Sequence, residues 1–450
     1  MWCVESCENE THMPDYQAAA ESEQERGNDP ERLDWFEGLG LGLFVHWSVD
    51  TQLGSVISHS MVGASEEYIE RYLEELPETF DPRRFDPVEW AQLARVAGVQ
   101  YVVFTTKHHN GFAMWDTDTT AFNVTNTPYG EDVLREVVDA FRAQDIAVGF
   151  YFSPDDFWLL HQQGRDISRD REEALPRNNQ ELMDHNRAQI RELFTDYGQV
   201  DTLFIDGDPT GIRELAWDLQ PEVVITRGWI ETPEQRVPDE PVDGPWESCL
   251  TLGTQWNFKS ADEAYKSPKE LVETFVETRA KGGNLLLNVG PRPDGTIPRE
   301  QEDRLRTLGL WNFVNREAVF ESTPAPTIRE GDVWFMQADE SEPTTVYAIL
   351  TDTHWPKDPE PRTVVLESVR ATAETDVGIL GQSGRVFEYR PEIEPVASWT
   401  QDDDRLYVTL THAQRIYNAD SGNLYEDEPD EVKWPYPVVV ELTNAQVQGS

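Results

Sequence analysis

Apolar runs and helical periodicities alternate along residues 30–321. Short apolar runs that end at Gly, Pro, His or Asp predict buried strands near residues 41–48, 99–106, 147–153, 200–206, 222–227, 246–251 and 284–290. Apolar residues at helical spacing predict helices near residues 65–75, 87–97, 132–144, 178–197, 211–219, 268–280 and 299–315. This alternation is typical of a parallel sheet covered by helices. It predicts an α/β fold of the (β/α)8-like TIM barrel type, with irregular later units.

The pattern changes on both sides of this region. Residues 1–29 are acidic and polar with little periodicity, which predicts a mobile leader. Beyond residue 322, short strands separated by turns are predicted near residues 333–336, 345–350, 363–366, 405–410 and 438–442. We therefore expect three parts: the leader (1–29), the barrel (30–321) and a C-terminal all-β sandwich domain (322–450).

Composition indicates a folded, acidic protein. Hydrophobic residues make up 38% of the 450 residues and aromatic residues 11%, enough for a large core. The formal net charge of -48 excludes nucleic acid and anionic membranes as natural partners. The acidic excess is spread along the chain, and only seven of the 37 basic residues are lysine. This surface chemistry favours a salt-adapted protein over one that binds cationic partners through an acidic tail.

Cysteine usage and hydropathy bear on the cellular compartment. Cys3, Cys7 and Cys249 offer neither a disulfide framework nor a convincing metal-ligand spacing. Apolar runs of the length that a signal peptide or a membrane span requires are missing. We expect a soluble cytoplasmic protein that does not associate with membranes.

Candidate reactive groups lie where the predicted strands end. Asp206 follows the strand near 200–206, His46 lies near the end of the first strand, and His108 and His109 follow the second. The carboxyl ends of parallel strands meet at one face of a barrel, so these side chains are expected to converge. Adjacent histidines face one cavity only where the strand has begun to turn. Taken alone, Asp206 could be a turn cap and each histidine a structural residue.

Six segments in order along the chain resemble the α-L-fucosidases of glycoside hydrolase family 29. They are FVHW at 44–47, KHHNGF at 107–112, the strand that ends at Asp206, ETPEQ at 231–235, WE at 246–247 and GGNLLLNVGP at 282–291. The resemblance covers about residues 32–322 and, by architecture alone, the β domain. It implies a retaining exo-glycosidase that removes terminal α-L-fucose from a fucoside or fucosylated glycan through a covalent glycosyl-enzyme. We expect no metal or other cofactor.

The resemblance also implies roles for individual residues. By motif match, Asp206 is the nucleophile and Glu234 the general acid/base. The other matched positions bind the sugar: His46, His108 and His109 hydrogen-bond its hydroxyls, Tyr151 is a pocket tyrosine with Phe152 as the neighbouring alternative, Arg227 lies near the acid/base loop, and Trp256 lines the pocket. The sequence departs from the family pattern at residues 55–59, where relatives often place a carboxylate and a Trp.

Physical chemistry is consistent with these roles. A retaining mechanism needs two carboxyl groups about 5–5.5 Å apart, one ionised and one protonated. We expect Asp206, near His and Arg donors, to stay ionised. We expect Glu234, beside Trp229 and Pro233, to lie in the more apolar setting that raises a carboxyl pKa. Neutral imidazoles offer sugar hydroxyls one donor and one acceptor each, and aromatic faces suit the methyl group of a deoxy sugar.

Two other classes of function use some of the same residues. His46, His108 and His109 could ligate a metal together with Asp206 in a barrel hydrolase, although adjacent histidines chelate poorly unless the backbone turns sharply. A non-catalytic sugar-binding protein would not require both Asp206 and Glu234. Within the fucosidase hypothesis, Glu231 and Glu247 are the alternatives for the acid.

Overall fold

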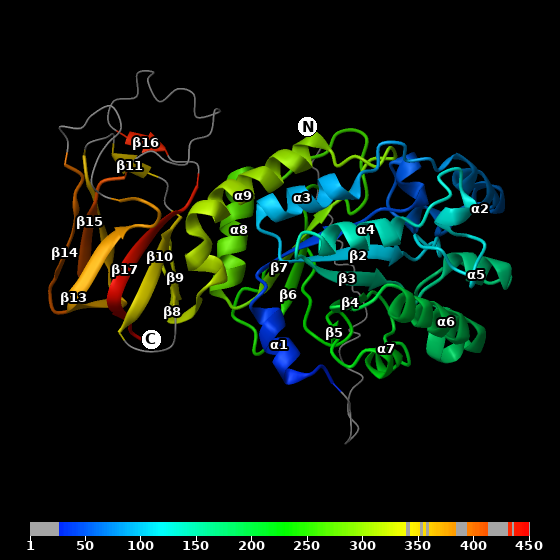
Figure 1. Ribbon diagram of the computed structural model, residues 1–450, viewed down its shortest axis with the longest axis horizontal. Coiled ribbons are helices and arrows are strands. Elements are labelled where there is room, and N and C mark those ends of the chain that lie inside the picture. Colours follow the sequence, from blue (N-terminus) through cyan, green and yellow to red (C-terminus); the bar gives the residue numbers. More distant parts are fainter. Residues whose placement is uncertain are drawn as a thin grey trace, which may run out of the picture.

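The computed structural model describes most of the chain beyond the predicted leader. The described residues are 27–338, 343–351, 354–356, 360–383, 394–412, 431–433 and 436–449. The leader expected at 1–29 therefore lies almost entirely outside them. Figure 1 shows an elongated molecule with a mixed helix and strand region at one end and a strand-rich region at the other. No helix in these ranges combines the length and apolarity that crossing a bilayer requires.

Seven parallel strands form the central sheet, in the order β5-β4-β3-β2-β1-β7-β6. Their bounds are β1 (Leu41–Val45), β2 (Tyr101–Lys107), β3 (Ala147–Phe152), β4 (Thr202–Ile205), β5 (Val224–Ile225), β6 (Glu247–Thr251) and β7 (Asn284–Val289). Nearly every residue of these strands is buried. Parallel strands covered on both faces need such continuous apolar runs, which is why the sequence pattern revealed them.

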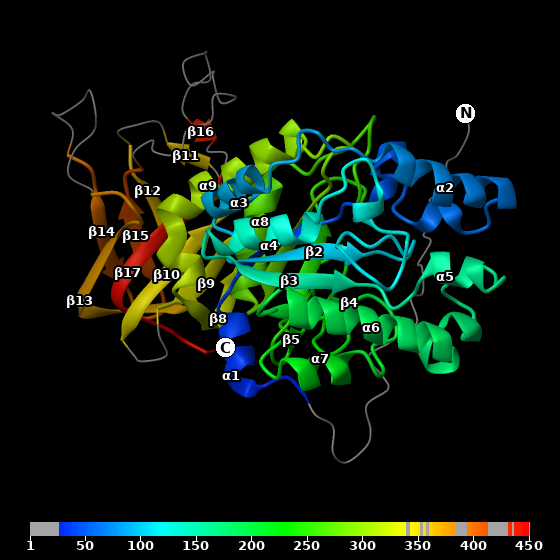
Figure 2. The same ribbon diagram turned by 45° about the vertical axis from the view of Figure 1, so that its right-hand side comes forward.

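Helices cover the outside of the curled sheet. Helices α3 and α4 lie near β2, and α6 and α7 lie near β4 and β5 (Figures 1 and 2). The α-helices are α1 (Pro30–Glu37), α2 (Glu66–Thr79), α3 (Pro87–Ala97), α4 (Val133–Arg142), α5 (Phe157–Gln162), α6 (Gln180–Asp196), α7 (Arg213–Leu219), α8 (Pro268–Ala280) and α9 (Arg299–Phe320). Short 3-10 helices are η1 (Val49–Leu53), η2 (His59–Met61), η3 (Val124–Asn126), η4 (Glu172–Ala174) and η5 (Pro176–Asn178). The start of α3 shows why a helix begins where it does. The Asp86 side chain accepts from the backbone N–H groups of Val88 and Glu89, and Pro87 occupies the first position of the helix.

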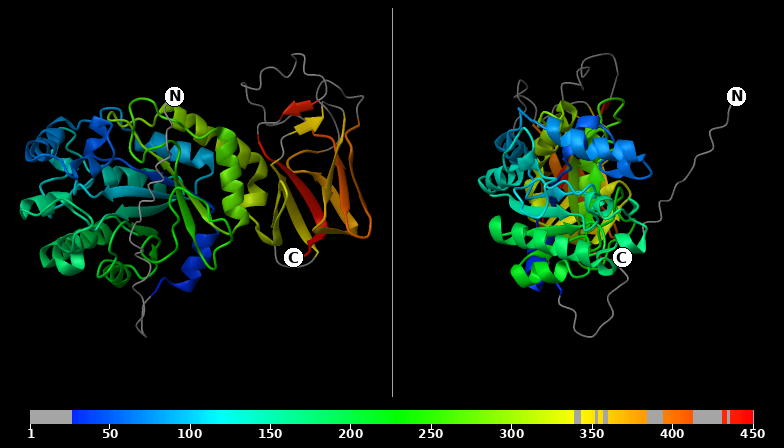
Figure 3. Two further views of the ribbon diagram at one scale, coloured as in Figure 1. Left: turned by 180° about the vertical axis from the view of Figure 1, so that it is seen from behind. Right: turned by 90° about the vertical axis from the view of Figure 1, so that its right-hand side faces the viewer.

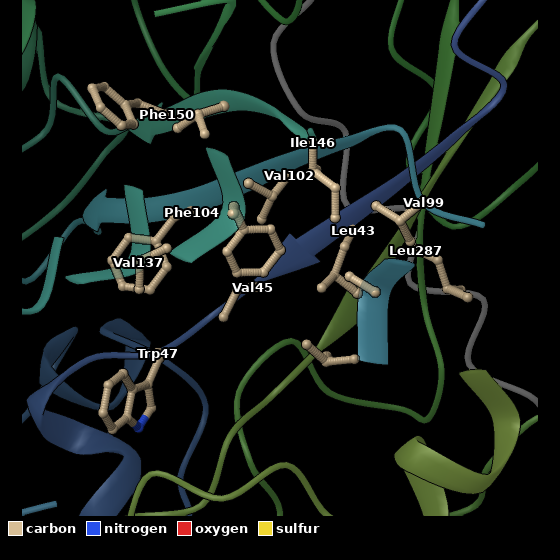
Figure 4. Packing of buried hydrophobic residues seen from close by; sticks show 14 of the residues in the cluster. Leu43, Val45, Trp47, Val99, Val102, Phe104, Val137, Ile146, Phe150 and Leu287 are labelled. Carbon is tan, nitrogen blue, oxygen red and sulfur yellow. The ribbon is translucent and has the colours of Figure 1, made fainter. Parts of the chain in front are cut away.

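Alternate residues of the strands feed two separate cores. Leu43 and Val45 of β1 pack with Val102 and Phe104 of β2 and with the covering helices, as Figure 4 shows. The residues between them, such as Phe44, belong to a smaller aromatic cluster on the concave side. This two-residue alternation places one set of side chains under the helices and the other set inside the curl of the sheet.

The sheet curls, but it is not a continuous eight-stranded ladder. Among the described residues, β5 and β6 are edge strands that are not paired with each other. Segment 231–235 runs beside β6 and makes two isolated parallel bridges, from Glu231 to Trp246 and from Glu234 to Cys249. The α/β fold is confirmed as a curled seven-stranded parallel sheet with additional antiparallel sheets.

The strand-rich region consists of antiparallel sheets (Figure 3). One sheet has the order β13-β17-β10-β9-β8, another β12-β15-β14, and β11 pairs with β16. Their bounds are β8 (Thr323–Glu330), β9 (Val333–Gln337), β10 (Thr344–Leu350), β11 (His354–Pro356), β12 (Arg362–Leu366), β13 (Val369–Ile379), β14 (Ala397–Gln401), β15 (Leu406–Leu410), β16 (Glu431–Lys433) and β17 (Val438–Val447). The five-stranded sheet shares one apolar core with β12 and β15. Its other face joins the large core that includes α9, where the Trp311 indole donates to the Pro437 carbonyl at 2.9 Å.

The chain changes from helices to strands near residue 322, as the sequence pattern predicts. Helix α9 ends at Phe320 and β8 begins at Thr323. The division into domains at residues 30, 321 and 322 stays a prediction, because the apolar core continues from α9 into the five-stranded sheet.

Candidate active site

A cavity of about 530 Å³ opens at the carboxyl ends of the parallel strands. It brings together all eight site residues predicted from the sequence: His46, His108, His109, Tyr151, Asp206, Arg227, Glu234 and Trp256. Other lining residues were not singled out for the site: Phe44, Val56, Ile57, His59, Arg169, Phe204, Gln235, Cys249 and Gln255. Strands β1, β2 and β4 end directly before His46, His108 and Asp206, as expected for side chains delivered by a parallel sheet.

Asp206 follows β4 and is held at both carboxylate oxygens. The Tyr151 hydroxyl donates to Oδ2 at 2.7 Å, and His109 Nε2 lies 3.4 Å from the same oxygen. Arg169 and Arg227 donate to Oδ1 at 3.3 and 3.5 Å. Burial alone would raise the pKa of Asp206, but Arg169, the His109 hydrogen bond and Arg227 together hold that pKa well below its usual value. The carboxylate is therefore ionised at neutral pH, as expected for a carboxyl group near His and Arg donors.

Glu234 lies on segment 231–235 beside β6. Its Oε2 accepts from Arg227 Nη2 at 2.8 Å, and its side chain is 35% exposed. The expected apolar setting beside Trp229 is wrong, because the chain turns at Thr226 and directs Trp229 against Trp217, with 5.3 Å between ring centroids. Arg227 therefore contacts both carboxyl groups of the site.

The three predicted histidines are buried and oriented by polar partners. Each bonds through Nδ1 to a side chain: His46 to Asn288 (2.6 Å), His108 to Ser58 (2.7 Å) and His109 to Ser153 (2.5 Å). Burial lowers the pKa of His46 to about 4, that of His109 to about 3, and that of His108 well below its usual value. The rings are neutral at pH 7, and Nε2 of His46 and His108 remains for a ligand in the cavity.

His109 lies between two polar neighbours. Nε2 faces the ionised Asp206 carboxylate, while Nδ1 faces the Ser153 hydroxyl. The charge of Asp206 favours the neutral ring with its proton on Nε2, in which Nδ1 is an acceptor. The Ser153 hydroxyl has one hydrogen for two acceptors, Nδ1 at 2.5 Å and the Asp155 carbonyl at 3.2 Å. His108 and His109 reach the same cavity because β2 ends in a turn, in which the Gly111 N–H donates to the His108 carbonyl.

Aromatic rings form one wall of the cavity. The rings of His46 and Trp256 lie 4.9 Å apart, and Tyr151 stacks on Phe204 at 5.6 Å. Tyr151 lines the cavity, whereas Phe152 points to the other face of β3, where Lys107 Nζ lies 4.5 Å from its ring. Alternation along the strand therefore separates the two candidates for the pocket position.

The segment that departs from the family pattern also reaches the site. Val56, Ile57 and His59 line the cavity. Between Ile57 and His59, Ser58 is buried with φ of 58°, an uncommon backbone conformation for a side-chain-bearing residue. Its N–H donates to Asp50 Oδ2 at 2.6 Å while its hydroxyl bonds His108. Through Ser58, residues 55–59 therefore still orient His108, one of the predicted sugar-binding residues.

The two alternatives for the acid are not among the residues that line the cavity. Glu247 is fully buried inside the curl of the sheet and accepts a hydrogen bond from the Tyr101 hydroxyl. Burial raises the pKa of Glu247 to about 7. The backbone carbonyl of Glu231 accepts from the Glu247 N–H at 3.1 Å, as part of the bridge to β6. Of these three glutamates, Glu234 is the one that shares the cavity with Asp206.

A possible cation site overlaps the same groups. Within the described part of the chain, His108, His109 and Asp206 could each offer one ligand atom, with all three atoms within 4.8 Å of one another. Two guanidinium groups already lie 3.3 and 3.5 Å from the Asp206 carboxylate. Their positive charge disfavours a metal cation at this position.

Comparison with known proteins agrees with the resemblance. A family model described as alpha-L-fucosidase matches residues 3–317. The tissue alpha-L-fucosidase of Rattus norvegicus is 28% identical over 421 residues, which cover 84% of this chain and 85% of that protein. The plasma alpha-L-fucosidase of Pongo abelii is 26% identical over 366 residues, covering 72% and 76%.

Solved structures show the same architecture. Alpha-L-fucosidase isoenzyme 1 from Paenibacillus thiaminolyticus superposes with a TM-score of 0.70 at 28% identity, covering 92% of this chain and 98% of that one. The alpha-L-fucosidase of Vibrio sp. strain EJY3 gives a TM-score of 0.71 at 22% identity, covering 94% and 74%. Because the family model spans more than two thirds of the residues, this chain belongs to the α-L-fucosidase family and is a glycosidase.

Proposed function

We propose that this fucosidase removes terminal α-L-fucose from fucosides or fucosylated glycans with retention, using Asp206 as nucleophile and Glu234 as general acid/base. The observation that carries this assignment is the shared guanidinium: Arg227 lies 3.5 Å from Asp206 and 2.8 Å from Glu234. Two carboxyl groups held by one guanidinium are close enough to act on one sugar ring, as the spacing of about 5–5.5 Å in retaining enzymes requires.

The reaction follows in two displacements. Asp206 attacks the anomeric carbon while the glycosidic C–O bond breaks, and Glu234 gives its proton to the departing oxygen. Glu234, now a carboxylate, then takes a proton from water as that water attacks the anomeric carbon and Asp206 leaves. Fucose is released with its original anomeric configuration.

Arg227 links the two steps. In the resting enzyme it is shared between two carboxyl groups. Ester formation removes the charge of Asp206, so the guanidinium then pairs chiefly with Glu234 in the carboxylate form that the second step needs. The neutral rings of His46 and His108 bind sugar hydroxyls, and Trp256 packs against the apolar part of the sugar.

We also infer that the curled sheet is an irregular (β/α)8-like barrel and that the antiparallel sheets form a sandwich. Segment 231–235 takes the place of a regular strand beside β6, which its two parallel bridges support. The apolar core shared by the five-stranded sheet with β12 and β15 supports the sandwich.

The test of the nucleophile is chemical rescue. Asp206→Gly should lower the release of nitrophenol from nitrophenyl α-L-fucoside by about 10³-fold or more without changing the circular dichroism spectrum. Azide, which fits the vacated space, should restore cleavage and yield β-fucosyl azide, because a single displacement inverts the anomeric centre. Activity like that of the wild type, or an α-azide product, would contradict the assignment. Other nitrophenyl glycosides are the substrate control.

A metal-assisted hydrolysis is the second candidate, favoured by the close approach of ligand atoms from His108, His109 and Asp206. The discriminating measurement is fucoside hydrolysis after dialysis against a chelator. The proposed mechanism predicts unchanged kcat/KM. A loss that a divalent cation restores would favour the metal site instead.

A further inference from the structure

The turn after β3, residues 153–156, lies directly beneath the nucleophile. Gly207 follows Asp206 with φ of +149°, and a Cβ placed there would lie 3.1 Å from Pro154 Cδ and 3.5 Å from Asp155 Oδ1. Asp155 is only 2% exposed. A buried carboxylate under the reactive residue needs a function or a partner, because its burial is costly when it is unpaired.

Arg169 is that partner, and it also reaches the nucleophile. Its Nε donates to Asp155 Oδ2 at 2.6 Å, while its Nη2 donates to the Asp206 carbonyl at 3.2 Å and to Asp206 Oδ1 at 3.3 Å. The Arg169 side chain is 16% exposed although it comes from the loop between α5 and α6. One planar guanidinium therefore joins two carboxylates and the backbone at the end of β4.

Arg169 supplies hydrogen bonds of fixed direction as well as a positive charge. A guanidinium has its donors in a fixed plane, so anchoring Nε on a rigid carboxylate fixes where Nη2 points. Asp155 is itself rigid, since it is buried between Pro154 and Asp156, and the Asp156 side chain caps α5. Burial raises the pKa of Asp155 to about 6, while Arg169 opposes this shift.

We propose that Arg169, anchored by Asp155, is a positioning residue that fixes the plane of the Asp206 carboxylate for attack on the sugar. The inference rests on the proposed role of Asp206 as nucleophile. Arg169 and Arg227 hold Oδ1, while Tyr151 and His109 hold Oδ2. With both oxygens held, the carboxylate cannot rotate between the two displacements, and Arg169 stabilises the charge that returns to it when the ester breaks.

Arg169→Gln is the primary variant, and Arg171→Gln is its matched control. Arg171 lies in the same loop but is exposed, and its partner Asp166 is exposed as well. For nitrophenyl α-L-fucoside, Arg169→Gln should lower kcat/KM by about 10²-fold, as loss of one positioning donor does elsewhere. Arg171→Gln should leave kcat/KM within about twofold. Melting temperatures of both variants show whether each is folded.

The pH profile separates positioning from a structural role. Arg169 holds the pKa of Asp206 down, so Arg169→Gln should raise that pKa and move the acidic limb of kcat/KM to higher pH. Asp155→Asn keeps the guanidinium charge but removes its anchor, so it should lower kcat/KM without moving the acidic limb upward. Arg169→Lys should keep the limb near the wild-type position but not restore the rate, because an ammonium lacks the planar, fixed donors that orient the Asp206 carboxylate.

Coupling between the two residues completes the test. If they act as one unit, the double variant Asp155→Asn with Arg169→Gln should be little worse than Arg169→Gln alone. Multiplicative losses, or a folded Arg169→Gln enzyme with wild-type rate and pH profile, would overturn the inference. A wild-type enzyme that does not cleave the fucoside would instead contradict the proposed function, so the two failures are distinguishable.

Discussion

Arg227 contacts both carboxyl groups of the site, so the chemistry of Asp206 and Glu234 is coupled through one side chain. The two groups nevertheless differ in their surroundings. Asp206 has four donors around it and a pKa held well below its usual value, whereas Glu234 is more exposed and lies on a segment beside an edge strand. A fixed, ionised nucleophile and a more accessible proton donor are the two roles that retention requires.

At the residue scale, the leaving group should reveal the acid. Protonation matters little when the departing phenolate is already stable, so Glu234→Ala should slow disaccharides far more than dinitrophenyl α-L-fucoside. The glycosyl-enzyme on Asp206 should accumulate, because the base for its hydrolysis is missing. Azide should release it as the α-azide, opposite in configuration to the product of Asp206→Gly. Steady-state rates, intact mass and product NMR measure these outcomes.

Glu231→Ala is the control for this experiment, because Glu231 belongs to the same segment but does not line the cavity. It should show no dependence on the leaving group. If Glu231→Ala shows that dependence and Glu234→Ala does not, the acid is misassigned even though the enzyme remains a fucosidase.

Strand ends predicted Asp206 and the three histidines, whereas the family resemblance was needed to predict Glu234, Tyr151, Arg227 and Trp256. Asp206, His108 and His109 follow continuous apolar runs, and such runs predict where a parallel strand delivers its next side chain. Arg169 gives no such signal, because it lies in a polar loop and acquires its role through Asp155 and the end of β4. The hydrogen bond from Arg227 to Glu234 was also missed, since it depends on the turn that carries Arg227 and Trp229.

At the scale of elements, register places the nucleophile and its hydrogen-bond donor side by side. Strands β3 and β4 pair with Tyr151 opposite Phe204 and Phe152 opposite Ile205, two and one residues before Asp206. Gly149, three residues before Phe152 on β3, allows β3 and β4 to approach each other closely. A Cβ there would lie 1.9 Å from Thr202 Oγ1 and 3.1 Å from the Thr202 and Val102 carbonyls.

Gly149→Ala should therefore destabilise the protein by about 1–3 kcal/mol, the usual range for overpacking. It should also lower kcat, because separating β3 from β4 lengthens the hydrogen bond between Tyr151 and Asp206. Gly378→Ala in β13 is the control, since a Cβ there meets nothing within 4 Å. Denaturant midpoints and kcat measure both effects. Equal midpoints for the two variants would contradict the role assigned to Gly149.

The elements that sequence reasoning missed have physical reasons for being missed. Strand β14 is largely exposed, β8 contains two prolines, and α5 spans only six residues, so none shows a regular apolar periodicity. Segment 231–235 was not predicted as a strand, because it pairs beside β6 through isolated bridges and not through a strand ladder. Its sequence contains Pro233, which interrupts a strand pattern. Its backbone is also irregular, with Gln235 at φ of 58°.

At the scale of the whole molecule, the dominant feature is a formal net charge of -48. Helix α2 illustrates it locally, because Glu67, Glu70 and Glu74 are exposed at helical spacing that brings like charges together. Repulsion between exposed charges extends about 10 Å at 0.1 M salt but only about 3 Å at 1 M. Concentrated salt should therefore stabilise the folded chain relative to dilute buffer.

We predict that the melting temperature rises by several degrees, and fucoside hydrolysis increases, when potassium chloride is raised from about 0.1 M to above 1 M. The double variant Glu70→Gln, Glu74→Gln removes two exposed like charges one helical turn apart that carry none of the site chemistry. At low salt its melting temperature should be higher than that of the wild type, because each like-charge pair lowers the free energy of unfolding by a few tenths of a kcal/mol. At high salt the two melting temperatures should be equal. Thermal unfolding followed by circular dichroism measures both trends. A wild-type melting temperature that does not change with salt would refute salt adaptation, because self-repulsion on this scale cannot be independent of screening.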